Sequence, residues 1–197
     1  RPFFASVAGL ESGTYEFSFD YYSTATPAAG ANIYSVSWEN WQNAKAAGDH
    51  VTTGGVKTAA VHRNFTATTD NGGRLTVGID LHGQVTGGVI YAWNFRLVKE
   101  GDGTNLLPNP DLKNGSLKNW CYSFKWFEQD AGVDPNGVCS AVEYDEKLLG
   151  LDDGKIYMLK MDLSKEADST DERPFFASVA GLESGTYEFS FDYYSTA

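Results

Sequence analysis

The sequence predicts an all-β protein built as a sandwich of two sheets. Apolar and polar residues alternate in most segments, and helical periodicity is nearly absent from the 197 residues. The alternating segments are short and are separated by turns rich in Gly, Asp and Asn. Aromatic residues make up 14% of the chain, enough to fill a large core. Strands at this spacing are typical of β-sandwiches.

The first expected strands lie in the N-terminal 25 residues. Phe3–Leu10 is apolar and extended, a turn follows at Glu11–Gly13, and Tyr15–Tyr22 alternates. The alternation places one set of aromatic rings on a single face: Tyr15, Phe17, Phe19 and Tyr21. We expect these two strands to form a hairpin.

The rest of the chain continues the same pattern. A turn at Asp70–Gly73 joins two of the expected strands, and Trp41–Ala47 could support one helical turn. The last strand before residue 100 should carry Ile90, Ala92, Asn94 and Arg96 on one side. The further expected strands are Ile33–Trp38, Lys57–Thr68, Leu75–Leu81, Val89–Val98, Trp120–Phe127, Ala141–Tyr144 and Lys155–Leu163.

An exact internal repeat is the strongest signal in the sequence. Residues 1–25 recur without substitution as residues 173–197, which gives a period of 172 residues. Folding physics does not require such identity, because surface positions tolerate change. The chain is therefore either a window on a tandem array of near-identical units or the product of an engineered duplication. A start at Arg1, without Met or signal peptide, indicates a piece of something longer.

The charge of the chain excludes two classes of partner. A net charge of −11 repels nucleic acid and anionic membrane surfaces. No apolar run reaches the length of a membrane-spanning helix, so we expect no membrane insertion.

Several short motifs resemble those of carbohydrate-binding modules of families 4, 9, 16 and 22. They are the opening NLLPNPDLKNGSLKNW from Asn105, then GKIYMLKMDL at 154–163, RPFFASVAGLESGTYEFSFDYYS, FTATTDNGGRLTVGIDL and VIYAWNFRLVKEG. The resemblance covers one whole period and implies a jelly-roll β-sandwich of the galactose-binding-like type. It also implies a polysaccharide as a possible partner.

The resemblance places a unit boundary at the link Gly101–Thr104. Residues 1–104 are then the latter part of one module, and residues 105–197 are the first part of the next. A full module needs both parts, so the two 25-residue copies compete for one position in the sheets. The chain could close on itself as a circular permutant, or neighbouring chains could complete one another head to tail.

Catalysis is not expected. His50, His62 and His82 lie in three different segments without metal-ligand spacing, and Ser is never in a nucleophile elbow. Carboxylate pairs cannot be located from spacing alone.

Two aromatic clusters are candidates for sugar binding, because a pyranose stacks on a planar ring while neighbouring polar groups bond its hydroxyls. Each cluster could instead be core. The first consists of Tyr34, Trp38 and Trp41, and the second of Tyr122, Phe124 and Trp126. Trp93 and Trp120 are better candidates for the core.

The same resemblance implies a structural calcium ion, but Lys113 and Asn94 stand where the family has acids. A cation needs anionic oxygen ligands, so we expect no cofactor or metal at that place. Another calcium site could use Asp111, Asp152 and Asp153.

The two cysteines, Cys121 and Cys139, enclose 17 residues. With no redox motif beside them, they predict a structural disulfide, and hence an extracellular or cell-surface location. Asn64 and Asn114 begin glycosylation sequons, and Asn114 is the better acceptor because Asn64 lies in an expected strand.

Two functions remain. The first is a non-catalytic repeat module of a long extracellular fibre, stalk or adhesin that assembles head to tail with identical neighbours. The alternative is a glycan-binding module whose weak affinities are multiplied by avidity in an array. Exact repetition favours the first, and the resemblance to carbohydrate-binding modules favours the second. We expect the structural role.

Overall fold

The structure is a computed structural model that describes residues 2–39, 45–69, 71–82, 87–122, 125–126, 134 and 137–165. For residues 125–126 it describes the backbone alone. Residues 1–167 form one compact unit. The second unit, residues 168–197, includes the second copy of the 25-residue repeat and lies outside the described residues.

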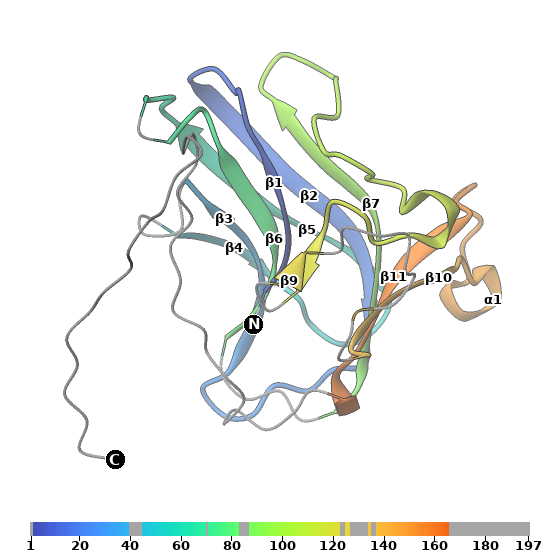
Figure 1. The fold of residues 1–197 in the computed structure, drawn as a ribbon. Helices are drawn as coiled ribbons and strands as arrows, with labels where there is room; N and C mark the ends of the chain where they lie inside the picture. Colours follow the sequence, from blue (N-terminus) through green and yellow to red (C-terminus); the bar gives the residue numbers. More distant parts are fainter. Residues whose placement is uncertain are drawn as a thin grey trace, which may run out of the picture. The chain divides into compact units, whose positions relative to one another are not determined.

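Two antiparallel sheets make up this unit, as Figure 1 shows. The six-stranded sheet has the order β4-β3-β6-β1-β8-β9, and the five-stranded sheet has the order β10-β11-β7-β2-β5. The prediction of an all-β chain is confirmed, and the two sheets are consistent with a β-sandwich. The strands are β1 (Pro2–Val7), β2 (Gly13–Ser23), β3 (Asn32–Trp38), β4 (Ala46–His50), β5 (Val56–Phe65), β6 (Leu75–His82), β7 (Val89–Lys99), β8 (Cys121–Tyr122), β9 (Lys125–Trp126), β10 (Cys139–Glu143) and β11 (Tyr157–Asp162).

The N-terminal strands do not form the expected hairpin. β1 pairs with β6 and β8 in one sheet, whereas β2 pairs with β5 and β7 in the other. The chain crosses between the sheets at residues 8–12, where the Tyr15 hydroxyl donates to the Glu11 carbonyl at 2.8 Å. β1 and β2 each present an apolar face to the core, and they do so from opposite sheets. In a hairpin, the two strands would lie in the same sheet and would cover the core from one side alone. The repeat therefore supplies a central strand to each sheet.

Aromatic rings from both sheets fill the core. The predicted face of Tyr15, Phe17, Phe19 and Tyr21 is confirmed, since each of these side chains is at most 2% exposed. From the opposite sheet, Leu75, Val77 and Ile79 of β6 point inward as predicted. Trp120 stacks on Phe3 with ring centroids 4.7 Å apart, and its centroid lies 4.8 Å from that of Phe95.

β7 departs from the predicted alternation at Asn94. This residue has a left-handed backbone (φ 54°), and the register with β2 shifts between Ser18 and Asp20. Asn tolerates this conformation better than most residues, and one extra residue in a strand reverses the facing of all that follow. Ile90 and Ala92 point inward as predicted. Beyond the bulge, Phe95 and Leu97 take the inward positions in place of Asn94 and Arg96.

Two loop predictions have different outcomes. The turn before β6 is present at residues 71–73, where the Asn71 side chain accepts from the backbone nitrogens of Thr68 and Gly73, both at 2.9 Å. The prediction of a helical turn over Trp41–Ala47 is wrong for its last two residues, because Ala46 and Ala47 are the first residues of β4. Residues 40–44 lie outside the described residues.

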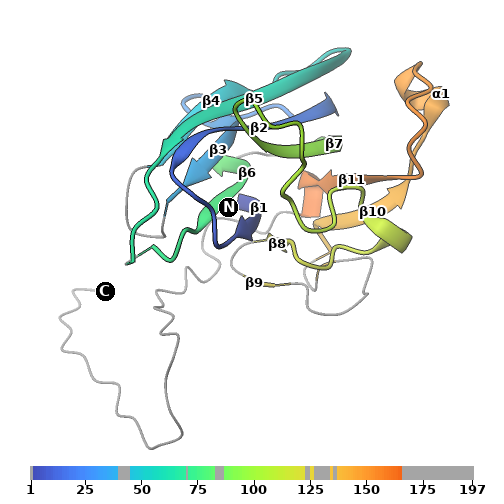
Figure 2. The same ribbon diagram turned by 90° about the horizontal axis from the view of Figure 1, so that it is seen from above.

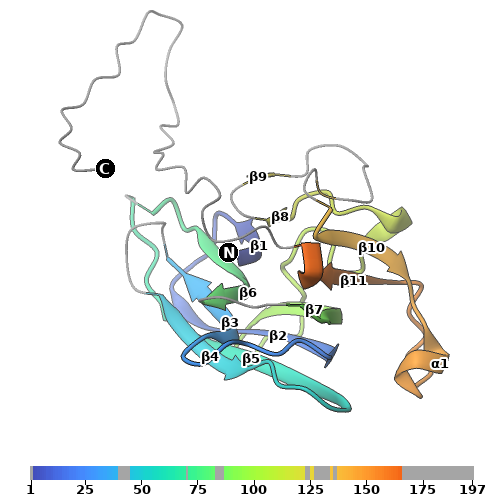
Figure 3. The same ribbon diagram turned by 90° about the horizontal axis from the view of Figure 1, so that it is seen from below.

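Residues 105–165 share both sheets with residues 2–99. β8 pairs with β1, and β11 pairs with β7; Figure 2 shows these additions beside the N-terminal strands. The strand expected over Trp120–Phe127 is instead two short strands, β8 and β9, which pair with each other. A short helix, α1 (Glu146–Leu149), was not predicted. It is capped by the Asp145 side chain and lies at the end of β10 (Figure 3).

The opening motif of this segment has a structural role. Asn105 Oδ1 accepts from the backbone nitrogens of Leu97 at 3.1 Å and Leu107 at 3.2 Å, while its amide donates to the Phe95 carbonyl at 2.8 Å. Asn105 thereby fastens the start of the segment to β7.

The predicted disulfide is wrong. Cys121 and Cys139 are both buried, and the structure shows no disulfide between them. Cys121 pairs with Phe4, whose side chain lies outside the core cluster, whereas Cys139 belongs to that cluster. The cysteines lend no support to an extracellular location.

Candidate binding site on the outer face of the six-stranded sheet

β3 divides its side chains between the core and the outer face of the six-stranded sheet. Ile33 belongs to the core, and the Ser35 hydroxyl donates to the Ala60 carbonyl of the other sheet at 2.7 Å. Because successive residues of a strand point to opposite faces, Tyr34, Val36 and Trp38 lie on the outer face. Gly78 of β6 is their neighbour there, and a side chain at this position would collide with the backbone of Phe3 and Phe4. We call this surface the β3–β6 face.

An ion pair stands at the centre of the β3–β6 face. Asp80 of β6 is opposite Tyr34 in the register and is 7% exposed. Its carboxylate accepts a hydrogen bond from Lys45 Nζ, which also lies 4.6 Å from the Tyr34 ring centroid and 5.9 Å from that of Trp38. Burial alone would lower the pKa of Lys45, but the interactions with Asp80 and Tyr34 raise it above its ordinary value. The lysine therefore stays charged beside the two rings.

Trp38 is the aromatic side chain at the edge of this arrangement. Its ring meets the buried Phe4 ring edge-on at 6.3 Å, and the side chain is partly exposed. The next residue, Glu39, accepts from Arg63 Nη2 at 2.7 Å and from Arg63 Nε at 3.1 Å. This pair fixes the end of β3 and with it the Trp38 backbone.

Two histidines flank Tyr34. The His50 ring centroid is 6.1 Å from that of Tyr34, and the His82 centroid is 6.3 Å away. The β3–β6 face thus combines a partly exposed indole with charged and neutral hydrogen-bonding groups. Trp38 is the ring of this face on which a sugar could stack, because Tyr34 is 8% exposed and Val36 is fully buried.

The structure brings together only part of the predicted aromatic sets. Tyr34 and Trp38 share the β3–β6 face, while Trp41 and Phe124 lie outside the described residues. Tyr122 is 2% exposed and packs in the core opposite Phe3. Trp126 is opposite Cys121, and Lys125 is opposite Tyr122, so the second set does not follow one continuous strand.

Lys45, Asp80, His50 and His82 were missed by the sequence analysis. Asp80 carried a signal, since it interrupts the apolar strand β6 at an outward position of the alternation. No comparable signal marks Lys45, because its contact with Asp80 joins residues 35 positions apart.

The aspartates considered for calcium are held apart. Lys155 Nζ donates to Asp111 at 2.8 Å, and the Gly154 nitrogen donates to Asp152 at 3.1 Å. Asp153 accepts from Trp93 Nε1 at 2.6 Å and from the Asn94 amide at 2.5 Å. Within the described ranges, no three His, Cys, Asp or Glu side chains are grouped so that they could hold a metal ion.

Tyr144 packs against Trp93 on the outer side of the five-stranded sheet. Its hydroxyl is buried and has no hydrogen-bond partner among the described residues, and its ring meets Trp93 edge-on at 5.5 Å. Burial, reinforced by the charges of Asp153 and Asp20, raises the pKa of Tyr144 to about 12.

The raised pKa predicts an alkaline loss of stability. The unfolded chain ionises this phenol near its ordinary pKa of 10.0, while the folded chain keeps it neutral up to about 12. The stabilisation is therefore complete below the first value and lost as the pH rises to the second. We expect the Tyr144→Phe variant to show a smaller fall in urea midpoint than the unmodified chain between about pH 10 and about pH 12. An unchanged slope in the variant would contradict this assignment.

The two sequons lie at exposed positions. Asn64 is in β5, where the Thr14 hydroxyl donates to its side chain at 3.0 Å. Asn114 is in the loop before β8 and has a left-handed backbone (φ 60°).

Comparison of the chain with protein-family models, with curated proteins and with solved structures gives no match. Among the described residues, no helix is both long enough and apolar enough to cross a membrane. The repeat and the geometry of the first unit are the observations that bear on function.

Proposed function

We propose that this protein is a non-catalytic repeat module of a long extracellular structural protein. One observation carries the proposal: the 25-residue segment recurs after 172 residues, and residues 1–167 are compact on their own. A single period thus suffices for both sheets, with the first copy in their centre, and the second copy begins the next period. Neighbouring identical modules are its partners.

The finer features of the proposal rest on the resemblance and on the repeat. The motifs favour a jelly roll of the galactose-binding-like type, and the uniform repeat suits a fibre or stalk in which each unit meets the same neighbour. An extracellular location is part of this proposal and does not depend on the cysteines.

Chains of increasing length test the modular proposal. With one, two and three complete periods, each followed by the 25-residue copy, we expect the maximum dimension in small-angle X-ray scattering to grow by a constant increment. Thermal unfolding should remain in the same temperature range, because each module has its own core. The modular proposal would be contradicted if the maximum dimension grew only as that of a single enlarging globule. It would also be contradicted if only the chain with one period were soluble.

A second candidate function is glycan binding on the β3–β6 face. It is favoured by the partly exposed Trp38 ring beside Tyr34 and the Lys45–Asp80 pair. Stacking and charge-assisted hydrogen bonds are the two interactions that a sugar requires.

A glycan array followed by calorimetry tests this function. Trp38→Ala should weaken binding about tenfold or more, because the stacking surface is lost. Trp38→Phe should retain part of the affinity, which separates stacking from a general disturbance of β3. Array-wide absence of binding to the unmodified chain would remove this candidate and leave the modular proposal intact.

A further inference from the structure

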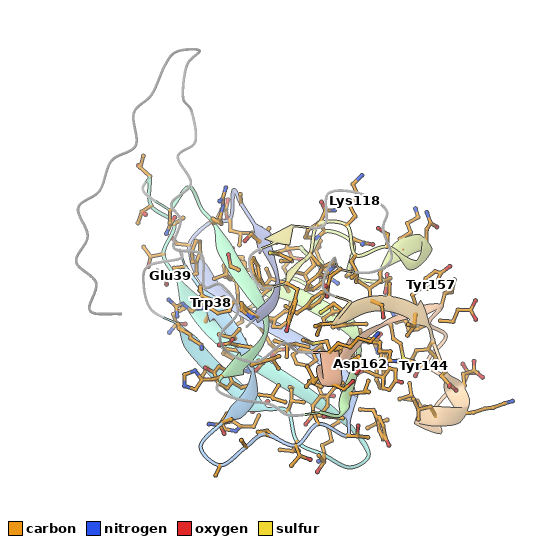
Figure 4. All side chains as sticks on the ribbon, turned by 60° about the horizontal axis from the view of Figure 1, so that its bottom comes forward. Trp38, Glu39, Lys118, Tyr144, Tyr157 and Asp162 are labelled. Carbon is orange, nitrogen blue, oxygen red and sulfur yellow. The ribbon has the colours of Figure 1, made fainter. Side chains whose placement is uncertain are left out.

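A pocket of about 580 Å³ lies away from the β3–β6 face, between the loop at residues 109–115 and the segment 154–157. Its apolar lining comes from Pro110, Ile156 and the partly exposed ring of Tyr157. Polar groups of Asp111, Lys113, Asn114 and Lys155 complete it. Figure 4 shows Tyr157 on the opposite side of the unit from Trp38, so the two surfaces are separate.

The loop on one side of the pocket is held in a strained conformation. Asn109, Leu112 and Asn114 all have left-handed backbones, with φ of 53°, 49° and 60°. For a residue such as Leu this conformation costs about 1–2 kcal/mol, and such strain persists only where the surroundings enforce it.

The side chain of Asn109 enforces it here. Its oxygen accepts from the Lys113 nitrogen at 2.7 Å, and its amide donates to the Ser116 and Lys118 carbonyls at 2.9 and 3.0 Å. Leu112 anchors the same loop in the core at 1% exposure. The loop therefore presents Lys113 and Asn114 to the pocket from a fixed position.

Charge in the pocket favours an anionic ligand. Asp111 neutralises Lys155 through a contact of 2.8 Å. Lys113 is exposed and has no acidic partner within the described part of the chain. The lining thus combines one uncompensated ammonium with the Tyr157 ring, in a chain whose net charge is −11.

We propose that this pocket binds an acidic saccharide, with the sugar ring stacked on Tyr157 and its carboxylate paired with Lys113. The C–H face of a pyranose suits the aromatic and aliphatic lining, and the Asn114 amide can bond a ring hydroxyl. The same chemistry is offered by a free sugar acid and by a residue within an acidic polysaccharide. Because Asn114 lines the pocket, an N-linked glycan on this residue would occupy the pocket and compete with both ligands.

NMR titration of the full chain, produced without glycosylation, tests the proposal. Glucuronate and galacturonate are added separately, with methyl glucoside as the neutral control, and a linear oligogalacturonide separates a polymer site from a monosaccharide site. We expect the amide signals of the pocket residues to shift at millimolar sugar acid and to shift less with the neutral sugar. Equal response to acidic and neutral sugars, or shifts confined to other regions, would overturn the proposal.

Three variants assign the contacts. Lys113→Gln should reduce the affinity for the sugar acid about fivefold and leave that for the neutral sugar unchanged. Tyr157→Ala should reduce both, and Lys118→Gln, which removes an exposed lysine outside the pocket lining, should change neither. If Lys113→Gln and Lys118→Gln weaken binding equally, the effect is one of general charge and the assigned site is wrong.

Discussion

Replacing Phe17 alone with Asp should leave a folded protein, whereas replacing Phe17 and Phe189 together should abolish folding. Phe17 is 1% exposed in the centre of β2, and a carboxylate there would be buried without a partner. That penalty is comparable to the whole stability of a domain. Phe189 is the equivalent position in the second copy, which has the same sequence and can make the same strand pairs.

The geometry of the chain allows the second copy to replace the first. The Leu163 nitrogen donates to the Gly88 carbonyl at 3.0 Å, and a side chain at Gly88 would touch the backbone of Ala25. β11 thus ends beside the end of β2, at the side of the sandwich where β1 begins. Residues 166–172 can span up to about 25 Å when extended. We expect this linker to let the second copy reach the vacated place.

Circular dichroism and urea unfolding of the full chain distinguish the outcomes. Phe189→Asp is the matched control and should leave the unfolding midpoint unchanged, because the first copy keeps its place. If Phe17→Asp alone is unfolded, the second copy cannot occupy the position of the first. If the double variant folds normally, β2 is not essential to the five-stranded sheet.

Trp120→Ala should lower the free energy of unfolding by about 3–5 kcal/mol. The Trp120 side chain is fully buried, stacks on Phe3, and donates from Nε1 to the Asn109 carbonyl at 3.1 Å. Its removal leaves a large cavity between the sheets and takes one of two hydrogen bonds from the Asn109 carbonyl, which also accepts from the Leu112 nitrogen at 3.3 Å. Urea unfolding followed by fluorescence measures the loss.

Trp38→Ala is the matched control for this prediction. Its indole lies on the β3–β6 face and is partly exposed, so its truncation should cost much less stability. Similar losses from the two variants would contradict the division between core and surface tryptophans.

The strands were predictable because their alternation reflects burial on one side. The faces of β2 and β6 follow directly from Tyr15–Tyr21 and Leu75–Ile79. Sheet membership was not predictable in the same way. A Gly-containing turn between two apolar strands fits both a hairpin and a crossing between sheets, and only the partners of β1 and β2 decide between them.

The candidate site was predictable only at its aromatic residues. Tyr34 and Trp38 share a face because they are four positions apart in one strand. The Lys45–Asp80 pair depends on contacts between β6 and the segment before β4, which no local pattern encodes. Asn94 shows a similar limit, since a single left-handed residue reversed the facing of half a strand.

The central position of the repeat has a consequence for synthesis. Within one period, β1 and β2 are synthesised before β5, β6 and β7, and they can pair with these strands once residue 99 has been made. The remaining neighbour of β1, which is β8, and the outer strands β10 and β11 are synthesised later. The last third of each period must therefore add its strands to two sheets that have already begun to form. In an array, the next identical copy emerges immediately afterwards. Correct pairing then requires that the sheets of one period are complete before the identical β1 and β2 segments of the next period are synthesised. The rate of chain elongation is therefore expected to affect how often the strands pair correctly.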